Sequence, residues 1–291
     1  MDDIERLAGQ FEENRPHLRA VAYRMLGSVS EAEDAVQEAW LRLSRSDASD
    51  IQNLAGWLTT VVSRVCLDQL RSRKTRREDP LDDLYVPDPI LSPVDPEDEA
   101  VRADAVGLAM MVVLDKLSPA ERLAFVLHDM FGLSFDEVAE VVDKTPAAAR
   151  QLASRARRRV QGAPVGDNDV SRQREVVDAF LAAARGGDFE ALLSLLDPNV
   201  VLRADAGTTE GRGPAVSKLV RGALAVVEQA LTFTKLAPHS RPALVNGRLG
   251  MVTVVGDTLM GVMDVTIHDG KITEINILAD LPRLEALPIP A

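Results

Sequence analysis

Residues 78–104 constrain the fold most, because prolines and acids are crowded there. This stretch holds five prolines, ten acidic residues and a single basic residue. Proline removes a backbone donor and fixes φ, so neither a helix nor a central strand tolerates such a density. The stretch therefore predicts an extended linker between separately patterned parts of the chain.

The charge distribution qualifies what the net charge implies. The chain has 33 basic and 45 acidic residues, a formal charge of −12, which taken alone argues against a nucleic-acid partner. However, residues 64–77 hold six basic residues and one acid, and residues 144–160 hold six basic residues and no acid. Most charge runs are solvated helix faces. Two basic runs at the ends of helical blocks favour a nucleic-acid footprint instead.

Helical periodicity dominates residues 11–77. Ser30 and Glu33 predict a capping box, and Ala32, Val36 and Leu43 lie on the apolar stripe of the helix that follows. A second helix is predicted over residues 54–73. We expect an all-α domain before the linker.

Helical patterns resume over residues 105–160. Ser118 with Glu121 and Ser134 with Glu137 predict two capping boxes, and Thr145-Pro146 predicts the start of a basic helix. A short helix, a tight turn and a basic helix are typical of a helix-turn-helix. The turn has no glycine, so residue 143 or 144 is expected in the left-handed conformation, which Asp tolerates.

The last third of the chain changes to strand patterns. Helices are predicted over 170–185, 189–196 and 213–230, and strands over 200–204, 231–236, 243–245, 249–255, 259–267 and 272–278. Asn246-Gly247 and Asp269-Gly270 are strong hairpin signals. This order predicts an α+β domain in which a curved antiparallel sheet wraps round helices.

Several classes of protein are disfavoured. Cys66 is the single cysteine, which excludes an intrachain disulfide and fits a reducing cytoplasm. Residues 1–10 lack a secretion-signal pattern, and the longest apolar run, residues 108–114, is too short for a membrane span. Because no metal-ligand spacing, phosphate loop or Ser/His/Asp order occurs, we expect no cofactor, no metal and no catalytic residue.

The motifs resemble the extracytoplasmic-function (ECF) sigma factors of bacterial RNA polymerase. Residues 15–41 and 57–73 are similar to the first conserved block of that family, and residues 117–122 and 145–156 to the second. The C-terminal part resembles the SnoaL-like, cone-shaped domain of one subgroup. The resemblance implies sigma region 2 at 1–77, the acidic linker at 78–104, sigma region 4 at 105–162, a linker at 163–169 and a SnoaL-like regulatory domain at 170–291.

The resemblance also implies a function, which is to bind polymerase core and direct it to promoters from the cytoplasm, without a membrane. The first helical block would bind the clamp helices of the core through Asp34, Gln37, Glu38, Trp40 and Leu41, although this face also fits ordinary solvent exposure. The −10 element would meet Asn53, Trp57, Arg64, Asp68, Arg71, Arg73 and Lys74. Core packing is the alternative role for both tryptophans.

The basic helix would enter the major groove of double-stranded promoter DNA at the −35 element. Arg150 suits guanine and Gln151 suits adenine by their donor and acceptor geometry. The full set of candidates is Thr145, Ala147, Ala148, Arg150, Gln151, Ser154, Arg155 and Arg158.

Two elements of the resembling subgroup differ here. A Trp-Leu-Pro-Glu-Pro linker element, which touches the C-terminal domain, corresponds to residues 85–89, with Tyr85, Pro87, Asp88 and Pro89 as regulatory candidates. The Asp-Gly-Gly-Gly element would fall at Asp205, where only one of the three glycines follows.

The C-terminal domain leaves three roles open. Cone-shaped domains include cyclases and isomerases, whose general acid or base would here be sought among Arg203, Asp205, Asp264 and His268. Asp264 lies in an alternating strand and is the candidate to face the cavity. A regulatory domain with an unidentified ligand is preferred to an enzyme, and a pure packing role lies between them. The rivals for the whole chain are a helix-turn-helix regulator that acts without polymerase and an enzyme fused to a DNA-binding module.

Overall fold

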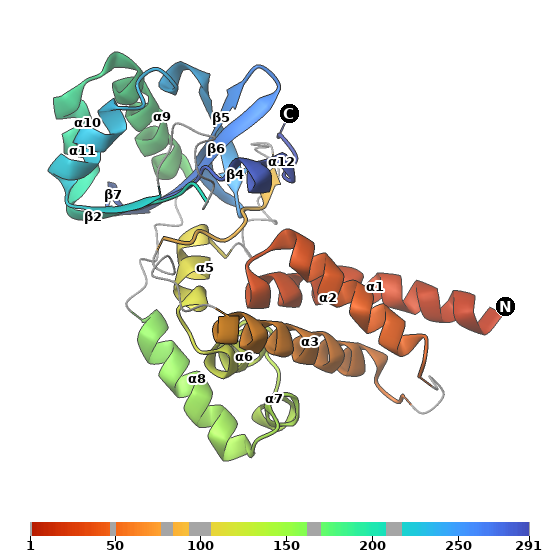
Figure 1. The fold of residues 1–291 in the computed structure, drawn as a ribbon. Coiled ribbons are helices and arrows are strands. Elements are labelled where there is room, and N and C mark those ends of the chain that lie inside the picture. Colours follow the sequence, from red (N-terminus) through yellow and green to blue (C-terminus); the bar gives the residue numbers. More distant parts are fainter. Residues whose placement is uncertain are drawn as a thin grey trace. The chain divides into compact units, whose positions relative to one another are not determined.

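The computed structural model describes residues 2–46, 51–76, 84–92, 106–161, 170–207 and 217–290 (Figure 1). The chain divides into two compact units, and each is considered by itself. Unit 1 comprises residues 1–79 and 113–162, and unit 2 comprises residues 80–112 and 163–291. Unit 1 thus joins helices from both sides of the acidic linker. The domain boundaries expected from the sequence stay a prediction.

Three helices form the first part of unit 1: α1 (Asp2–Leu26), α2 (Val29–Leu43) and α3 (Leu54–Arg76). All three pack against one another. Their buried contacts include Phe11 and Leu18 of α1, Val36 of α2 and Leu58 of α3. The predicted helices of this block are confirmed.

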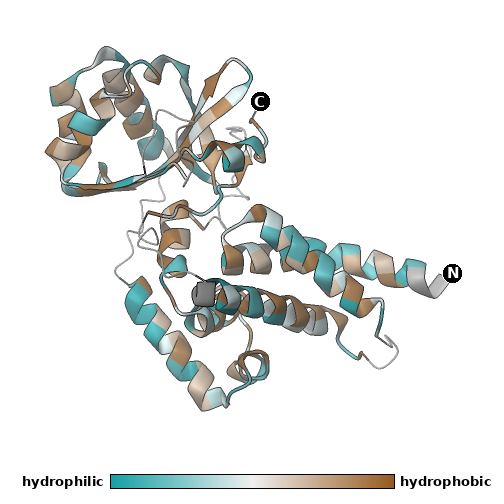
Figure 2. Ribbon diagram, viewed as in Figure 1, coloured by the Kyte–Doolittle hydropathy of each residue, from teal (hydrophilic) through white to brown (hydrophobic). Residues whose placement is uncertain are grey.

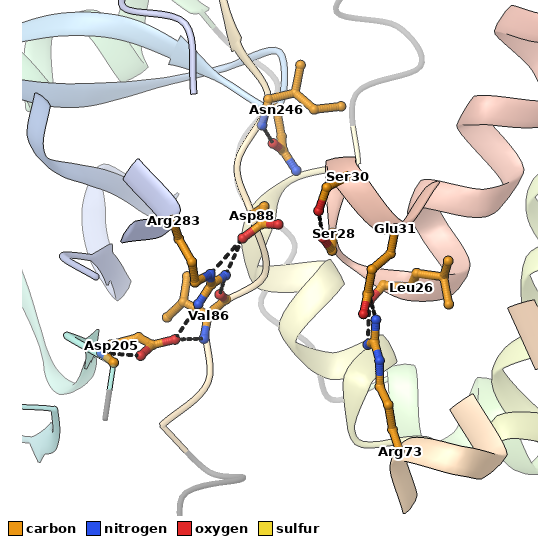
Figure 3. Close-up of polar contacts among 12 residues, drawn as sticks. Leu26, Ser28, Ser30, Glu31, Arg73, Val86, Asp88, Asp205, Asn246 and Arg283 are labelled. Atoms are coloured by element: carbon orange, nitrogen blue, oxygen red, sulfur yellow. Dashed lines mark hydrogen bonds and ion pairs between the residues drawn. The ribbon is translucent and has the colours of Figure 1, made fainter. Parts of the chain in front are cut away.

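The start of α2 differs from the expectation. The helix begins at Val29, its N-cap residue Ser28 makes no side-chain capping bond, and the Ser28 and Ser30 hydroxyls lie 3.1 Å apart (Figure 3). The Glu33 carboxylate pairs instead with Arg19 of α1 at 2.9 Å. The capping box predicted at Ser30 is therefore wrong, because helix–helix ion pairing uses the carboxylate that the box needed.

The second part of unit 1 contains the helix-turn-helix. It follows α5 (Leu108–Asp115) and consists of α6 (Pro119–Phe125), the π-helix η3 (Val126–Met130), α7 (Phe135–Val142) and α8 (Pro146–Val160). The capping boxes of Ser118 and Ser134 are both present, and Asp143 has φ of 55°, as expected for the turn. The π-helix was not predicted.

One buried arginine ties these helices to the first three. Arg122 of α6 is 1% exposed and donates to the Arg24 carbonyl of α1 at 3.1 Å. It also pairs with Asp115 at 3.0 Å. Because α3 contacts α6 and α7 as well, the two helical blocks form one packed body within unit 1.

Unit 2 is built on a seven-stranded sheet of order β1-β4-β5-β6-β7-β2-β3, antiparallel except where β2 pairs with β7. The helices are α9 (Val170–Gly186), α10 (Phe189–Leu195), α11 (Ala223–Leu231), the 3-10 turn η4 (Ala237–His239) and α12 (Leu281–Glu285). The strands are β1 (Leu91–Ser92), β2 (Leu196–Asp205), β3 (Lys218–Arg221), β4 (Ser240–Val245), β5 (Arg248–Val255), β6 (Thr258–His268) and β7 (Lys271–Leu278).

This architecture confirms the α+β expectation. The Asn246-Gly247 and Asp269-Gly270 turns have φ between 50° and 73° at all four positions, the left-handed pair that tight hairpins require. One sheet face packs on α9, α10 and α11 in a continuous apolar core, and Figure 2 shows brown, hydrophobic residues alternating with paler and teal ones along these strands and helices. Side chains alternate between the faces, so Arg203, Asp264 and Asn276, which are cross-strand neighbours, share the other face.

Two predicted elements of unit 2 are wrong. The helix expected over 213–230 is interrupted, since Lys218–Arg221 pairs with β2 and Gly222, at φ of 89°, separates it from α11; its first residues lie outside the described ranges. The strand expected over 231–236 is a series of turns. There the Thr232 and Thr234 hydroxyls donate to carbonyls at the end of α11, so that local side-chain bonds replace strand pairing.

Candidate functional site

The α2 face predicted to bind a partner is presented to solvent. Asp34, Gln37 and Leu41 are exposed and Glu38 is half-buried, at the i, i+3, i+4 and i+7 spacing of one helix face. Glu38 pairs with Arg42 at 2.9 Å. Trp40 lies at the margin, with its ring 5.1 Å from that of the buried Phe11. The face is thus acidic and polar with an apolar border.

A second stripe runs along α3. Asn53, Arg64, Asp68 and Arg71 are exposed and Trp57 is half-buried, and their spacing of four, seven, four and three residues keeps them on one side of the helix. The Asn53 side chain accepts the Gly56 amide at 3.0 Å. Asn53 therefore also caps the helix.

Two candidate arginines of α3 make contacts inside unit 1. Arg73 donates to the Leu26 carbonyl at 3.0 Å and pairs with Glu31, which joins α3 to α1 and α2 (Figure 3). Arg64 donates to the Glu140 carbonyl of α7 at 2.8 Å. The side chain of Lys74 lies outside the described residues.

The predicted recognition surface is the outer face of α8. Thr145, Ala147, Arg150, Gln151, Ser154, Arg155 and Arg158 are exposed, and Ala148 is half-buried, whereas Ala149, Leu152, Ala153 and Ala156 are buried. The Thr145 hydroxyl caps the helix by accepting the Ala148 amide at 3.3 Å. Figure 2 shows teal, hydrophilic segments along this helix.

The arginines of α8 fall into two groups. Arg155 and Arg159 pair with Glu121 at 3.6 and 2.9 Å, and Arg157 pairs with Asp129 at 2.6 Å. Among the described residues, no carboxylate pairs with Arg150 or Arg158. The Arg150 guanidinium lies 5.5 Å from the centre of the Phe135 ring, which supports it from α7.

Glu121 fixes α8 on α6. Burial alone raises the pKa of this carboxyl, but hydrogen bonds from Ser118 and the charges of Arg159 and Arg155 outweigh burial, so its pKa is lowered. The carboxylate is thus both the capping-box acceptor and the partner of two arginines. Sequence reasoning identified only the first role.

In unit 2, the linker segment 84–92 is bound by side chains from the C-terminal half of the chain. Arg283 of α12 pairs with Asp205 at 2.8 Å, donates through Nε to Asp88 at 2.7 Å, and bonds to the Val86 carbonyl (Figure 3). The Val86 amide in turn donates to Asp205 at 3.0 Å. The guanidinium also lies 4.8 Å from the centre of the Tyr85 ring.

The far end of the same segment is held by Asn246. Its side-chain oxygen accepts the Ile90 amide at 2.7 Å, its backbone amide donates to the Ile90 carbonyl at 2.8 Å, and its side-chain nitrogen donates to Val106 at 3.2 Å. The expected contact of residues 85–89 with the C-terminal domain is therefore observed. The sequence pattern identified Asp205 but not Arg283, and it identified Asn246 only as a turn residue.

The titratable candidates for catalysis do not line the cavity of the described domain. Arg203 pairs with Glu274 at 2.9 Å, Asp205 binds the linker, and His268 is exposed at a turn. Asp264 is fully buried, and burial raises its pKa to about 7. The expectation that Asp264 faces the cavity is wrong, because its neighbour Met263 does so and adjacent strand residues point to opposite faces.

Within the described residues, no group of three or more His, Cys, Asp or Glu side chains is arranged to hold a metal ion. A bilayer-spanning helix was also sought in that part of the chain, and none has the length and apolar character required.

Known proteins match the chain over nearly its full length. The family models for Sigma-70 region 2 and Sigma-70 region 4 match residues 10–76 and 108–160. The chain is 41% identical to the ECF RNA polymerase sigma factor SigJ of Mycobacterium tuberculosis, over 96% of this chain and 94% of that protein. It is 36% identical to the probable ECF sigma factor SigI of the same species, over 99% and 98%.

A solved structure shows the same similarity. The crystal structure of M. tuberculosis SigJ superposes with a TM-score of 0.75 at 38% identity, covering 97% of this chain and 99% of that one. Together with the helix-turn-helix, these matches indicate a transcription factor rather than an enzyme. The chain belongs to the ECF sigma factors of RNA polymerase and is a polymerase-associated, promoter-specific transcription initiation factor.

Proposed function

We propose that three exposed surfaces divide the work of this sigma factor. The α2 face around Asp34, Glu38 and Leu41 binds the clamp helices of core polymerase. The α3 stripe from Asn53 to Arg71 contacts the −10 element, and the outer face of α8 reads double-stranded DNA at the −35 element. The linker segment 84–92 and the domain that binds it modulate these activities, and the protein acts in the cytoplasm without catalysis.

The arrangement of the α8 arginines carries this proposal. Acids on α6 and η3 pair with three of them, Arg155, Arg157 and Arg159. Among the described residues no acid pairs with Arg150 or Arg158, so the guanidinium groups of these two can pair with the phosphates of a bound DNA. Gln151 and Ser154 lie beside them on the exposed face. Side chains near the start of a recognition helix reach base edges, and cations further along meet phosphates. The α8 face therefore combines side chains that can recognise bases with cations that can bind phosphates.

The linker contact supports a regulatory role for the C-terminal domain. Segment 84–92 belongs to the stretch that connects sigma region 2 to region 4, and the domain binds it at both ends through Arg283 and Asn246. When the domain holds the linker, sigma regions 2 and 4 can adopt fewer positions relative to each other. The domain would thus act on initiation by restricting the linker between the two regions.

Promoter-specific transcription reconstituted with core polymerase tests the proposal. We expect Arg158→Ala to weaken initiation on all promoters and to lower the salt dependence of DNA binding by about one counterion, since it removes a phosphate contact. We expect Gln151→Ala to cost about 1–3 kcal/mol at one base pair of the −35 element and to relax preference there.

Arg157→Ala is the matched control, because it removes the same charge from the same helix at a position already paired with Asp129. Its effect on promoter choice should be small. Equal losses for the variants at 151, 157 and 158, with no change in base preference, would contradict the assignment of the α8 face.

A further inference from the structure

Unit 2 contains a partly open cavity of about 140 Å³ between its sheet and its helices. The wall is mainly apolar, with Phe180 from α9, Ala230 from α11, Met251 from β5 and Met263 from β6 among the lining residues. Thioether side chains adapt their shape to a guest. Packed interiors rarely leave such a space empty, and engineered apolar cavities of about this size take up small hydrophobic molecules.

One charged side chain lines the cavity among the described residues, that of Lys218 at the start of β3. Its ammonium lies 5.6 Å from the centre of the Phe233 ring, which is also part of the wall. Burial lowers the pKa of Lys218. No carboxylate pairs with this ammonium in the described part of the chain.

The other polar side chains of the wall bond to protein atoms. The Ser240 and Thr253 hydroxyls bond to each other at 2.8 Å, and the Gln229 side-chain nitrogen donates to Thr232 at 2.7 Å. Lys218 is therefore the wall group whose hydrogen-bonding capacity a guest would use. A partly buried cation gains most from an anion that replaces the water it has lost.

We propose that this cavity binds a small hydrophobic carboxylate whose carboxylate pairs with the Lys218 ammonium and whose ring or chain fills the apolar wall. An apolar cavity of about 150 Å³ holds benzene, so a guest of about six to ten non-hydrogen atoms matches the space. A single negative charge matches a single lysine. A dianionic phosphate would leave charge uncompensated in apolar surroundings, which is costly.

The cavity shares two elements with the linker contact. Ala204 and Leu281 line it, and Asp205 and Arg283, which bind segment 84–92, follow them on β2 and α12. A guest gives the side chains of the wall dispersion contacts that they otherwise lack. We expect bound carboxylate to stabilise these ends of β2 and α12 and so to tighten the linker, a step that rests on the proposed regulatory role.

Isothermal titration of the full-length chain with octanoate and with 1-octanol tests the site directly, whatever the fate of the proposed function. Octanoate should bind more tightly than the alcohol. Lys218→Met should weaken octanoate at least tenfold and leave 1-octanol within threefold, whereas Lys218→Arg, which keeps the charge, should restore octanoate. Lys235→Met removes an exposed lysine outside the wall and serves as the control.

Equal affinity of the wild-type chain for the two probes, or unchanged octanoate binding to a folded Lys218→Met variant, would overturn the proposal. So would a failure of both probes to bind. Amide hydrogen exchange at Val86, which should slow when octanoate is bound, tests the transmission to the linker. If octanoate binds but exchange at Val86 does not change, the proposed ligand site stands and the proposed effect of the ligand on the linker is refuted.

Discussion

Replacing Arg283 by Met should release segment 84–92 near Val86 and Asp88 while leaving the C-terminal domain folded. Arg283 holds Asp88, Asp205 and the Val86 carbonyl at once, and Met keeps much of its apolar stem. The side chains of Arg283, Asp88 and Asp205 are 21%, 14% and 10% exposed, so two nearly buried carboxylates would lose their cation.

The size of the effect follows from that burial. Removing one partner of a buried ion pair costs about 3–5 kcal/mol. Because the guanidinium keeps some solvent contact, the lower end applies, about 3 kcal/mol, which is roughly a hundredfold change in an equilibrium constant. Amide exchange of Val86, measured by NMR, should therefore accelerate about a hundredfold. Ile90 should accelerate less, since Asn246 still binds it from both sides.

Arg221→Met is the control, because it removes an exposed arginine from β3 of the same domain. It should leave both amides unchanged. If Arg283→Met leaves Val86 exchange within threefold of the wild type while the domain stays folded, the reasoning about this anchor is refuted.

Three further predictions concern buried groups. Arg122→Met should destabilise unit 1 by about 3–5 kcal/mol in urea unfolding, and adding Asp115→Asn should recover part of the loss, since it removes the unpaired charge; additive losses would contradict the pairing. The pKa of Asp264 is raised to about 7 by burial, so its contribution to stability is complete below its ordinary pKa of 3.8 and is lost as the pH rises through 7. Asp264→Asn should then raise Tm relative to the wild type by more at pH 8 than at pH 5, where only part of the contribution is lost, and an equal shift at both would contradict this. Burial raises the pKa of Cys66 to about 12, so iodoacetamide should modify it only as α3 unfolds, and fast labelling of the native chain would argue against that burial.

The elements that the sequence predicted well are those with a local signal. Periodic apolar positions, the Ser118 and Ser134 capping boxes and the Asn246-Gly247 turn each depend on a few neighbouring residues, and all were found. The failures have tertiary causes. Glu33 pairs with arginines of α1 rather than capping α2, and residues 218–221 pair with β2 rather than continuing a helix.

The candidate site shows the same division. Exposure of the α2 and α8 faces follows from helical spacing, so Asp34, Gln37, Arg150 and Gln151 were predicted to be accessible and are exposed. The partners of Arg73 and the linker contacts of Arg283 join residues far apart in sequence, and no local pattern reports them. Only the folded chain separates the arginines that pair with acids on neighbouring helices from those proposed to contact DNA.

The affinity of the full-length chain for core polymerase tests the central claim most directly. Asp34→Ala with Glu38→Ala should raise the Kd at least about tenfold, because it removes two negative charges from the face proposed to meet the clamp helices. Glu190→Ala with Glu228→Ala makes the same charge change at exposed positions of the C-terminal domain and should leave the Kd unchanged. A Kd for the α2 variant within twofold of the wild type, or equal losses for both pairs, would contradict the account.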